Sequence, residues 1–459
     1  MIRTVLLILS GNAFGALMLF VRNLAVARLI TVEDYGIAAT FAISMAIVEM
    51  ASGLGLQQLI IQDKEGNDPN LQAGLQGFNI LRGVISGVIL FFLAGPIAGF
   101  LNIPDVVWAY QLLALVPVIR GFEHFDIYRL NREMKFGPLL LTKTVPALIG
   151  VLSIWPLYLA YDDYRIMLYS VLLHWVLVVV TSHLVARRRY RANLDRSVMR
   201  RALHFGWPLL ITNTLLFAIF QGDKIIVGRT MGLEDLALFT MGVTLTLSPL
   251  LVSASSEKQF FLPQLSAARD DDTFDRLANA AMQASLVSGL GLVTLMTLIA
   301  RPLVDVLLGE RYAALGPILV LFAIWQAVRI FKVGGTIAAL SKAQTSNEMV
   351  TNVIRILALP IAWNIAVAGG TLSQILWVAI AGECLAFGAA LVLVRVRLGL
   401  KLDRQVLPIL IAFCLLGVAA STTIFPLPGD MMLLAKGLVV ILFLATLASA
   451  RTLRAYITN

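Results

Sequence analysis

Long apolar segments alternate with short polar ones along the whole chain. The apolar segments recur from Thr4 to Ser449. A helix needs about 20 mostly apolar residues to cross a bilayer, and it satisfies its own backbone hydrogen bonds. Uninterrupted runs such as Val84–Leu93 and Leu290–Ala300 argue against the short alternating strands of a β-barrel. The pattern therefore predicts an all-α polytopic membrane protein.

Charges, prolines and glycines divide these segments into fourteen predicted transmembrane helices. The first six are Thr4–Ile30, Ile37–Ile61, Phe78–Leu101, Val107–Ile127, Leu139–Ala160 and Ile166–Ala186. The next six are Phe205–Met231, Leu236–Phe261, Leu277–Ala300, Ala314–Leu340, Met349–Ala368 and Leu372–Val394. The last two are Val406–Phe425 and Met431–Ser449.

The loops between these helices alternate in charge. With a cytoplasmic N-terminus, the inward loops include the basic segments Arg129–Lys135 and Arg187–Arg191, whereas outward loops such as Asp162–Asp163 are short and acidic or neutral. Lysine and arginine favour the cytoplasmic side. Two loops fit poorly, because Asp63–Asn70 is acidic but inward and Arg301–Arg311 is outward. We expect a bacterial inner-membrane protein with both termini in the cytoplasm.

A weak internal repeat relates two parts of the chain. Val26–Asp34 aligns with Val227–Asp235, and Asn12 falls on Asn213 in the same register. Chance identity in apolar sequence is the alternative interpretation. Both copies begin on the cytoplasmic side, which predicts parallel repeats of the kind found in transporters. The expected parts are a six-helix lobe over residues 1–190, a second six-helix lobe over 191–395, and two further helices with a cytoplasmic tail over 396–459.

Composition excludes several classes of protein. Hydrophobic residues make up 59% and charged residues 14% of the 459 residues, against roughly 45–50% and 25% in soluble domains. The net charge of +9 is spread over loops between apolar spans, so no nucleic-acid partner is expected. The four histidines form no metal constellation, and neither a phosphate loop nor a nucleophile beside a base occurs. The sequence predicts no enzyme, no metal site and no cofactor.

Ionisable residues inside the predicted spans are the candidates for function, because a charge at membrane depth is costly and faces a cavity or a partner. Arg120 and Glu123 share one face of the fourth predicted helix, and Arg329 and Lys332 share one face of the tenth. The deep charges tilt cationic, which suggests an anionic substrate group such as a phosphate or pyrophosphate. Arginine suits that role through its planar donor fork.

The candidate residues fall into three groups by chemistry. The expected cationic cavity consists of Arg22, Arg120, Lys224, Arg329 and Lys332. Acids for ion coupling or structure are Glu49, Glu123 and Asp223. The polar cavity lining is Asn12, Asn23, Asn213 and Gln326. The alternative is an ion-pair network that only locks helices together, and Arg82, Lys143 and Arg355 lie near helix ends where they can snorkel.

Three stretches of the sequence carry a resemblance to a known family. They are Arg28–Gly36 with Gly53–Gln62, Phe205–Gly232 with Phe260–Ser266, and Leu308–Tyr312. In these stretches the chain resembles the polysaccharide transporters or oligosaccharide flippases of the Wzx type, in the superfamily that also holds the MATE multidrug extruders. The resemblance implies a two-lobe fold of fourteen helices. It also implies alternating-access movement of an undecaprenyl-pyrophosphate-linked oligosaccharide from the cytoplasmic to the periplasmic leaflet.

Several functions remain open at this point. The resemblance favours a flippase for surface polysaccharide or exopolysaccharide, with membrane lipids, a polysaccharide polymerase and chain-length machinery as expected partners. Coupling to H⁺, Na⁺ or the membrane potential is left open. The alternatives are a cation-coupled multidrug extruder, a flippase for the peptidoglycan precursor, and a non-transporting assembly scaffold. The cationic excess counts against the drug extruder, and the buried charges count against the scaffold.

Overall fold

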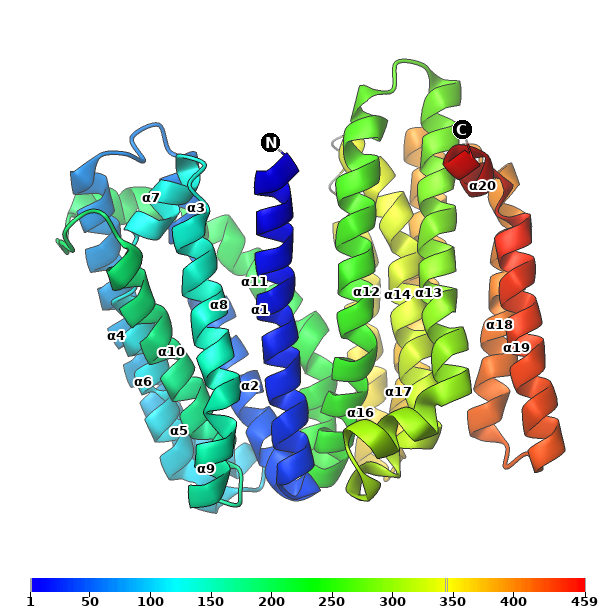
Figure 1. The fold of residues 1–459 in the computed structure, drawn as a ribbon, viewed down its shortest axis with the longest axis horizontal. Helices are drawn as coiled ribbons and strands as arrows, with labels where there is room; N and C mark the ends of the chain where they lie inside the picture. The colour runs from blue at the N-terminus through cyan, green and yellow to red at the C-terminus, as the bar shows by residue number, and fades with distance from the viewer. Residues whose placement is uncertain (1, 343, 345, 459) are drawn as a thin grey trace. The chain divides into compact units, whose positions relative to one another are not determined.

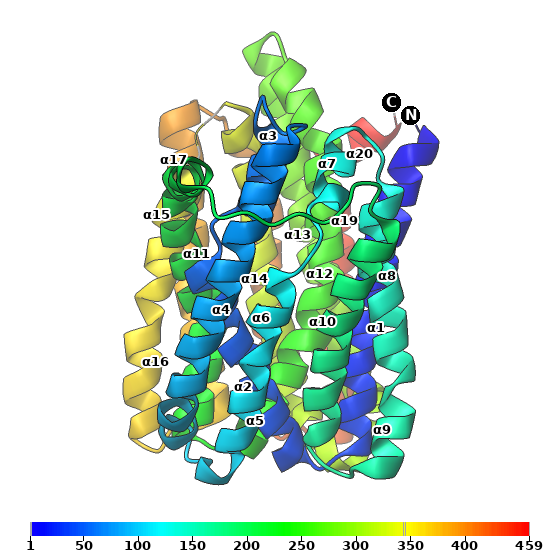
Figure 2. The same cartoon turned by 90° about the vertical axis from the view of Figure 1, so that its left-hand side faces the viewer.

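The computed structural model describes residues 2–342, 344 and 346–458, with side chains described for 13–48, 53–342, 344 and 346–457. Over this part of the chain the regular elements are helices and none is a strand, which confirms the predicted fold class. The chain divides into two compact units, Met1–Ala237 and Leu238–Asn459. Figures 1 and 2 together label the helices of both units.

The first unit contains eleven α-helices and the start of a twelfth. They are α1 (Ile2–Leu29), α2 (Val32–Ser52), α3 (Leu56–Gln62), α4 (Pro69–Phe100), α5 (Val107–Leu113), α6 (Leu115–Gly121), α7 (Asp126–Arg132), α8 (Gly137–Leu152), α9 (Ile154–Ala160), α10 (Arg165–Val185), α11 (Arg196–Thr230) and α12 (Leu233–Ala267). Figure 2 shows α4, α6, α10 and α8 side by side in this unit, with α1 beside α8. Helix α11 packs against α2, α3 and α4 of the same unit.

The second unit continues α12 and adds eight α-helices. They are α13 (Asp271–Leu307), α14 (Leu315–Ser341), α15 (Ser346–Ile356), α16 (Ala358–Val367), α17 (Leu372–Leu398), α18 (Val406–Ile424), α19 (Gly429–Ser449) and α20 (Arg451–Thr458). Helix α14 lies at the centre, packed against α13, α17 and α18. Helices α18 and α19 pack on each other and on α13. The last two predicted spans therefore lie at the outside of this unit.

Apolar side chains hold each unit together. In the first unit one cluster gathers around Phe41, Tyr110 and Leu168, and a second around Ile60, Leu75 and Phe125. Within a bilayer such side chains stabilise the unit through close van der Waals packing between helices, because lipid is as apolar as the core. The corresponding cluster of the second unit joins α12, α13 and α14 through residues such as Phe261, Ala281 and Ile337.

Several predicted helices are broken. The second, expected over Ile37–Ile61, ends at Ser52 and resumes as α3 at Leu56. Between them Gly55 adopts the left-handed conformation with φ of 63°, which glycine adopts without the steric cost that a Cβ imposes. The fourth predicted helix, Val107–Ile127, is also interrupted: the segment Pro104–Gly121 and helix α7 are bent by 51°. Glu123 lies in that bend, so the prediction that it continues the helical face of Arg120 is wrong.

Within the described part of the chain, fewer helices qualify as membrane spans than the fourteen that the sequence predicts. Eleven helices there are long and apolar enough to cross a membrane, or twelve when the bent segment from Pro104 to Arg132 is included. Helices α1 and α2, 28 and 21 residues long, include residues whose side chains lie outside the description. A multi-pass membrane protein is confirmed, and the count of fourteen is not.

The acidic loop that fits the charge rule poorly is neutralised locally. Arg201 on α11 pairs with Asp63 at 2.6 Å and with Glu65 at 2.5 Å. The Arg132 guanidinium also donates to the carbonyl of Ile61 at 2.7 Å and to that of Asp63. Basic side chains thus surround this loop at the end of the first unit that carries Arg129–Lys135. The loop is consistent with the predicted cytoplasmic placement of that end.

The boundary between the two units falls inside α12, between Ala237 and Leu238. It lies later in the chain than the predicted lobe boundary at residue 190. Because α11 packs on α2, α3 and α4, it belongs to the first compact unit. The predicted lobes over 1–190 and 191–395, which follow the sequence repeat, and the segment 396–459 stay predictions.

Candidate functional site

The break between α2 and α3 leaves backbone polar groups of the first unit available for hydrogen bonds outside the helix. Gly53 follows α2, and its carbonyl accepts a hydrogen bond of 3.1 Å from the side-chain amide of Asn213 on α11. A helix break frees backbone carbonyls and amides, and these are tolerated at membrane depth where they find partners or line a cavity. Asn213 therefore ties α11 to the broken helix.

A cavity of about 280 Å³ lies at this break. Its lining combines the break itself with polar side chains from α3, α4, α6 and α11 and two leucines, one each from α3 and α11. These residues are Gly53, Gly55, Leu56, Gln57, Gln58, Asn79, Arg82, Arg120, Leu209 and Asn213. Two guanidinium groups and four side-chain amides thus line one small cavity, and no carboxylate is among its lining residues.

Asn79 on α4 organises the two arginines. Its side-chain amide donates to the carbonyls of Arg120 and Gly121 at 3.0 and 3.1 Å, while its oxygen accepts from Arg82 at 2.8 Å. The Arg120 guanidinium lies 4.1 Å from the ring centroid of Trp175 on α10, a cation–π contact. Both arginines are therefore held by neighbouring groups, so their donor forks are positioned before any ligand arrives.

Glu123 lies beside this cavity and is buried. The Tyr128 hydroxyl donates to it at 2.8 Å, and the Gln57 amide, which lines the cavity, donates to it at 3.5 Å. With Arg82 and Arg120, the local formal charge is two cations against one anion. The site retains a net positive charge, so an anionic ligand would be stabilised there.

The predicted residues of the first unit divide into two groups. Arg120 and Asn213 line the cavity, and Glu123 contacts it through Gln57. The cavity lining does not include Arg22, Asn23, Asp223 or Lys224. Arg22 on α1 has a buried Nε without a hydrogen-bond partner among the described atoms. The side chains of Asn12 and Glu49 lie outside the described residues.

Sequence reasoning missed four polar cavity residues. Arg82 was set aside as a side chain that can snorkel, yet it lines the cavity, as do Gln57, Gln58 and Asn79. The available signal was local: Arg82 follows Asn79 by three residues on α4, and the glutamines begin two residues after Gly55 in the helix break. Their convergence depends on packing between α3 and α4, which no single segment reveals.

The second unit contains a separate cluster of charges. Glu383 on α17 is buried and pairs with Lys332 at 2.5 Å, with Arg355 at 2.5 Å and with Arg329 at 3.5 Å. Arg329 also donates to Gln326 at 3.3 Å. The predicted stripe of Gln326, Arg329 and Lys332 is therefore a real face of α14. Its cations share one carboxylate, and the cluster keeps a formal excess of positive charge.

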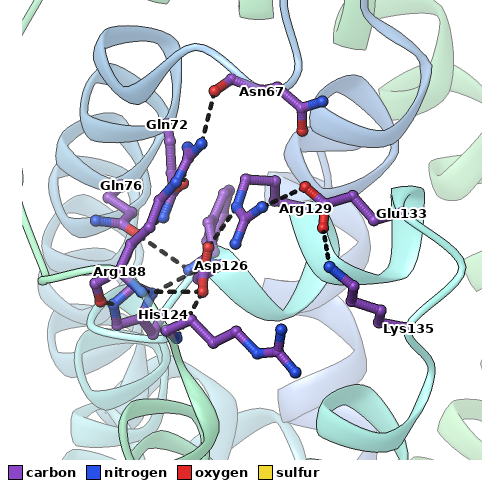
Figure 3. A network of polar contacts seen from close by, with 11 residues as sticks. Asn67, Gln72, Gln76, His124, Asp126, Arg129, Glu133, Lys135 and Arg188 are labelled. Carbon is purple, nitrogen blue, oxygen red and sulfur yellow. Dashed lines mark hydrogen bonds and ion pairs between the residues drawn. The ribbon is translucent and has the colours of Figure 1, made fainter.

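A polar network supports the bend beside the first cavity, as Figure 3 shows. Asp126, at the start of α7, accepts from the Arg129 side chain at 2.6 Å and from the backbone amides of Arg187 and Arg188 at 2.8 and 3.2 Å. The Arg188 guanidinium in turn donates to Gln72 on α4 at 3.1 Å. These bonds fasten the basic loop between α10 and α11 to α4 and α7.

The same network continues on both sides of the bend, to Gln76 on α4 and to the residues that follow α7. Gln76 on α4 donates to the carbonyl of Arg191 at 2.6 Å and accepts from the backbone amide of Phe125 at 3.0 Å. Lys135 donates to Glu133 at 2.7 Å, and this hydrogen bond lowers the pKa of that half-buried carboxyl. Burial raises the pKa of Tyr190 in the basic loop to about 12. The bend is thus anchored on both sides by hydrogen bonds.

Solved structures of membrane transporters share this fold. The chain is similar to the lipid II flippase MurJ in an inward closed conformation, with a TM-score of 0.72 and 14% identity over 98% of this chain and 100% of that one. It is also similar to an inward-facing multidrug resistance MATE family transporter of the MOP superfamily, with a TM-score of 0.69 and 15% identity over 84% of this chain and 94% of that one. At these identities the likeness concerns the fold alone.

A family model described as polysaccharide biosynthesis protein matches residues 25–317, and the chain belongs to that family. An uncharacterized membrane protein in the cps region of Klebsiella pneumoniae is 23% identical over 72% of this chain and 68% of its own length. The lipopolysaccharide biosynthesis protein WzxC of Escherichia coli is 23% identical over 71% of this chain and 66% of its own length. The chain therefore spans about two thirds of these relatives.

Proposed function

We propose that this protein is a flippase that moves an undecaprenyl-pyrophosphate-linked oligosaccharide from the cytoplasmic to the periplasmic leaflet of the bacterial inner membrane, for surface polysaccharide or exopolysaccharide synthesis. The observation that carries the proposal is the cavity that Arg82 and Arg120 share beside the helix break. Membership of a polysaccharide biosynthesis family and a fold shared with a lipid II flippase support it.

The chemistry of the cavity fits the charged group of such a substrate. Guanidinium forks bind phosphate oxygens in pairs and keep their charge at any physiological pH. A volume of about 280 Å³ suits a pyrophosphate rather than an oligosaccharide, since pockets for whole drug-sized ligands run from roughly 300 to 1,000 Å³. Amide groups of Gln57, Gln58 and Asn213 surround the arginines and offer hydrogen bonds to the first sugar.

Movement of the substrate would use alternating access between two six-helix lobes, with both chain termini in the cytoplasm. The sequence repeat and the fold are the support for this step. A polysaccharide polymerase and chain-length machinery would use the product on the periplasmic side. A cationic drug is a poor ligand for a site that carries two arginines and one glutamate.

The proposal is tested by Arg82→Ala and Arg120→Ala in a strain that lacks the chromosomal copy. Arg165→Ala is the matched control, because Arg165, the first residue of α10, pairs with Asp163 at 2.7 Å and is not among the residues that line the cavity. We expect both cavity variants to reach the membrane in normal amounts, to lose surface polysaccharide and to accumulate lipid-linked oligosaccharide. Normal surface polysaccharide in both cavity variants would overturn the assignment of the site.

A further inference from the structure

Glu257 on α12 is a buried carboxyl with an unusual set of partners. Its side chain accepts hydrogen bonds from three serine hydroxyls: Ser253 at 3.0 Å, Ser285 at 2.6 Å and Ser288 at 2.8 Å. Ser253 lies one turn earlier on α12, and the other two lie one turn apart on α13. Glu257 is 8% exposed. Three hydroxyls from two helices therefore enclose one carboxyl group.

The surroundings of Glu257 are otherwise apolar. The cluster that joins α12, α13 and α14 includes Phe261, Ala278, Ala281 and Met282, each at most 3% exposed. Charged and titratable groups on the elements packed around the site include Lys258 on α12, Asp271, Asp272, Asp275 and Arg276 on α13, Arg329 and Lys332 on α14, and Arg451, Arg454 and Tyr456 on α20, with Glu234 and Asp235 of α12 and Arg301 and Asp305 of α13 towards the other ends of those helices. Among the described residues, no ion pair joins any of them to Glu257.

The contrast with Glu383 in the same unit is informative. Glu383 pairs with Arg329, Lys332 and Arg355, so its negative charge is compensated. Glu257 is surrounded by hydroxyl groups, which can donate to a carboxylate and can equally accept from a carboxylic acid. An uncompensated buried charge is costly, and a membrane-embedded acid without a counter-ion is typical of proton pathways.

Ser285 supplies the means to accommodate both protonation states. Its Oγ lies 2.6 Å from Glu257 Oε2, 3.1 Å from the carbonyl of Ala281 and 2.9 Å from the backbone nitrogen of Gly334. A hydroxyl has one hydrogen and two acceptor lone pairs, and the Gly334 N–H takes one lone pair. When Glu257 is ionised, the Ser285 hydrogen points to Oε2. When Glu257 is protonated, its O–H donates to Ser285, whose hydrogen turns to Ala281.

Both arrangements use the same heavy-atom positions. The proton enters by forming the Oε2–H bond of Glu257 and leaves by breaking it, and a rotation of the Ser285 hydroxyl restores the hydrogen bonds in each case. A monovalent cation fits less well, because the serine oxygens already lie within hydrogen-bond distance of the carboxyl oxygens. No group of three or more histidine, cysteine or acidic side chains suitable for a metal ion occurs among the described residues.

We propose that Glu257, with Ser253, Ser285 and Ser288, is a proton-binding site, and that its protonation is coupled to substrate movement. The coupling rests on the proposed flippase function, whereas the proton binding does not. Ser285 joins α12, α13 and α14 through Glu257 and Gly334. Gly334 lies two residues from Lys332 on α14, so a change at Glu257 acts directly on the helix that carries the cationic cluster.

Proton binding is measured by infrared difference spectroscopy of the purified protein in liposomes at a series of pH values. We expect a protonated-carboxyl C=O band that grows on acidification, disappears in Glu257→Gln and shifts in frequency in Ser288→Ala, which loses one hydrogen bond. Glu310→Gln, at an exposed acid between α13 and α14, is the control and retains the band. Size-exclusion chromatography verifies that each variant is folded.

Two results would overturn the proton site. One is a band with the same titration in wild type and Glu257→Gln. The other is a carboxyl band that responds to added Na⁺ at constant pH, which would assign the site to a cation. Coupling is measured separately, as the stimulation of lipid flipping by a pH gradient. We expect Glu257→Gln to lose this stimulation. Wild-type protein that shows the band but flips no lipid would contradict the proposed function and leave the proton site standing.

Discussion

The side-chain amide of Asn213 donates a 3.1 Å hydrogen bond to the carbonyl of Gly53. Gly53 directly follows α2, in the break before the chain resumes as α3. This bond connects α11 to a helix break more than 150 residues away in the sequence. It also places Asn213 in the wall of the cavity that holds Arg82 and Arg120. The geometry of the cavity therefore depends on α11 staying fastened to the break.

Asn213→Ala should loosen the cavity without unfolding the protein. The variant loses one hydrogen bond and leaves the Gly53 carbonyl without this partner, which costs about 1–3 kcal/mol where the carbonyl is buried. We expect a lower thermal unfolding temperature in detergent and reduced polysaccharide export. Thr212→Ala is the control, because Thr212 is exposed and its hydroxyl bonds within its own helix, to Pro208. Equal unfolding temperatures for the two variants would contradict the role of Asn213.

Gly55→Ala should destabilise the helix break. An alanine at this position would have to adopt a φ of +63°. Its Cβ would also lie 2.5 Å from a methyl carbon of Leu209. The left-handed conformation alone costs about 1–2 kcal/mol for a residue with a Cβ. Gly55→Asn should cost less backbone strain than Gly55→Ala, because asparagine adopts the left-handed conformation more readily than alanine.

A matched glycine provides the comparison for the helix break. Gly95 lies inside α4, and a Cβ there meets nothing within 4 Å. Alanine favours a helix interior over glycine by about 1 kcal/mol, so Gly95→Ala should leave the unfolding temperature unchanged or raise it. A similar loss of stability in Gly55→Ala and Gly95→Ala would show that the left-handed break has no special importance.

Asp126→Asn should release the basic loop that Figure 3 shows. The buried carboxylate accepts from Arg129 and from the backbone amides of Arg187 and Arg188. Hydrogen bonds to a charged group contribute about 1.5–3 kcal/mol each, so the variant should lower the unfolding temperature and expose the loop to trypsin. Glu133→Gln is the control, because Glu133 is a half-buried acid at the edge of the network and does not bond the basic loop. Unchanged trypsin cleavage in Asp126→Asn would contradict the anchoring.

Glu383→Gln should be the most destabilising single change among the charged residues of the second unit. It removes the carboxylate that Lys332 and Arg355 both contact at 2.5 Å and leaves buried cations without compensation. Breaking a buried ion pair costs about 3–5 kcal/mol. The double variant Glu383→Gln with Lys332→Met should recover part of that loss, because one buried cation is gone. A double variant less stable than Glu383→Gln would argue against charge compensation.

The hydrophobic pattern predicted the helical membrane fold well, because apolar length and loop charge are local properties of the sequence. It missed the breaks in the predicted helices Ile37–Ile61 and Val107–Ile127. At the first break the chain stays apolar. At the second, Glu123 was interpreted as a charge on the same helical face as Arg120. The bend at Glu123 is held by Asp126 and Arg188, which meet only after folding. A helical-face argument across that bend therefore failed.

The candidate residues were predicted in part for the same reason. Depth and charge selected Arg120 and Asn213, which line one cavity. They did not select Arg82, because a position near a helix end suggested snorkelling. The pairing of Lys332 with Glu383 joins residues on α14 and α17, and no local pattern indicates which buried acid meets which buried cation.

The most direct test of the account is flipping of a purified undecaprenyl-pyrophosphate-linked oligosaccharide in proteoliposomes, measured as access of an added glycosidase to the sugar. We expect transfer by wild type and by Arg165→Ala, and loss of transfer in the double variant Arg82→Ala with Arg120→Ala. Lipid II and a cationic dye, assayed in parallel, distinguish the alternative substrates. Transfer at the wild-type rate by the double variant would contradict the claim that these two arginines hold the anionic group of the substrate.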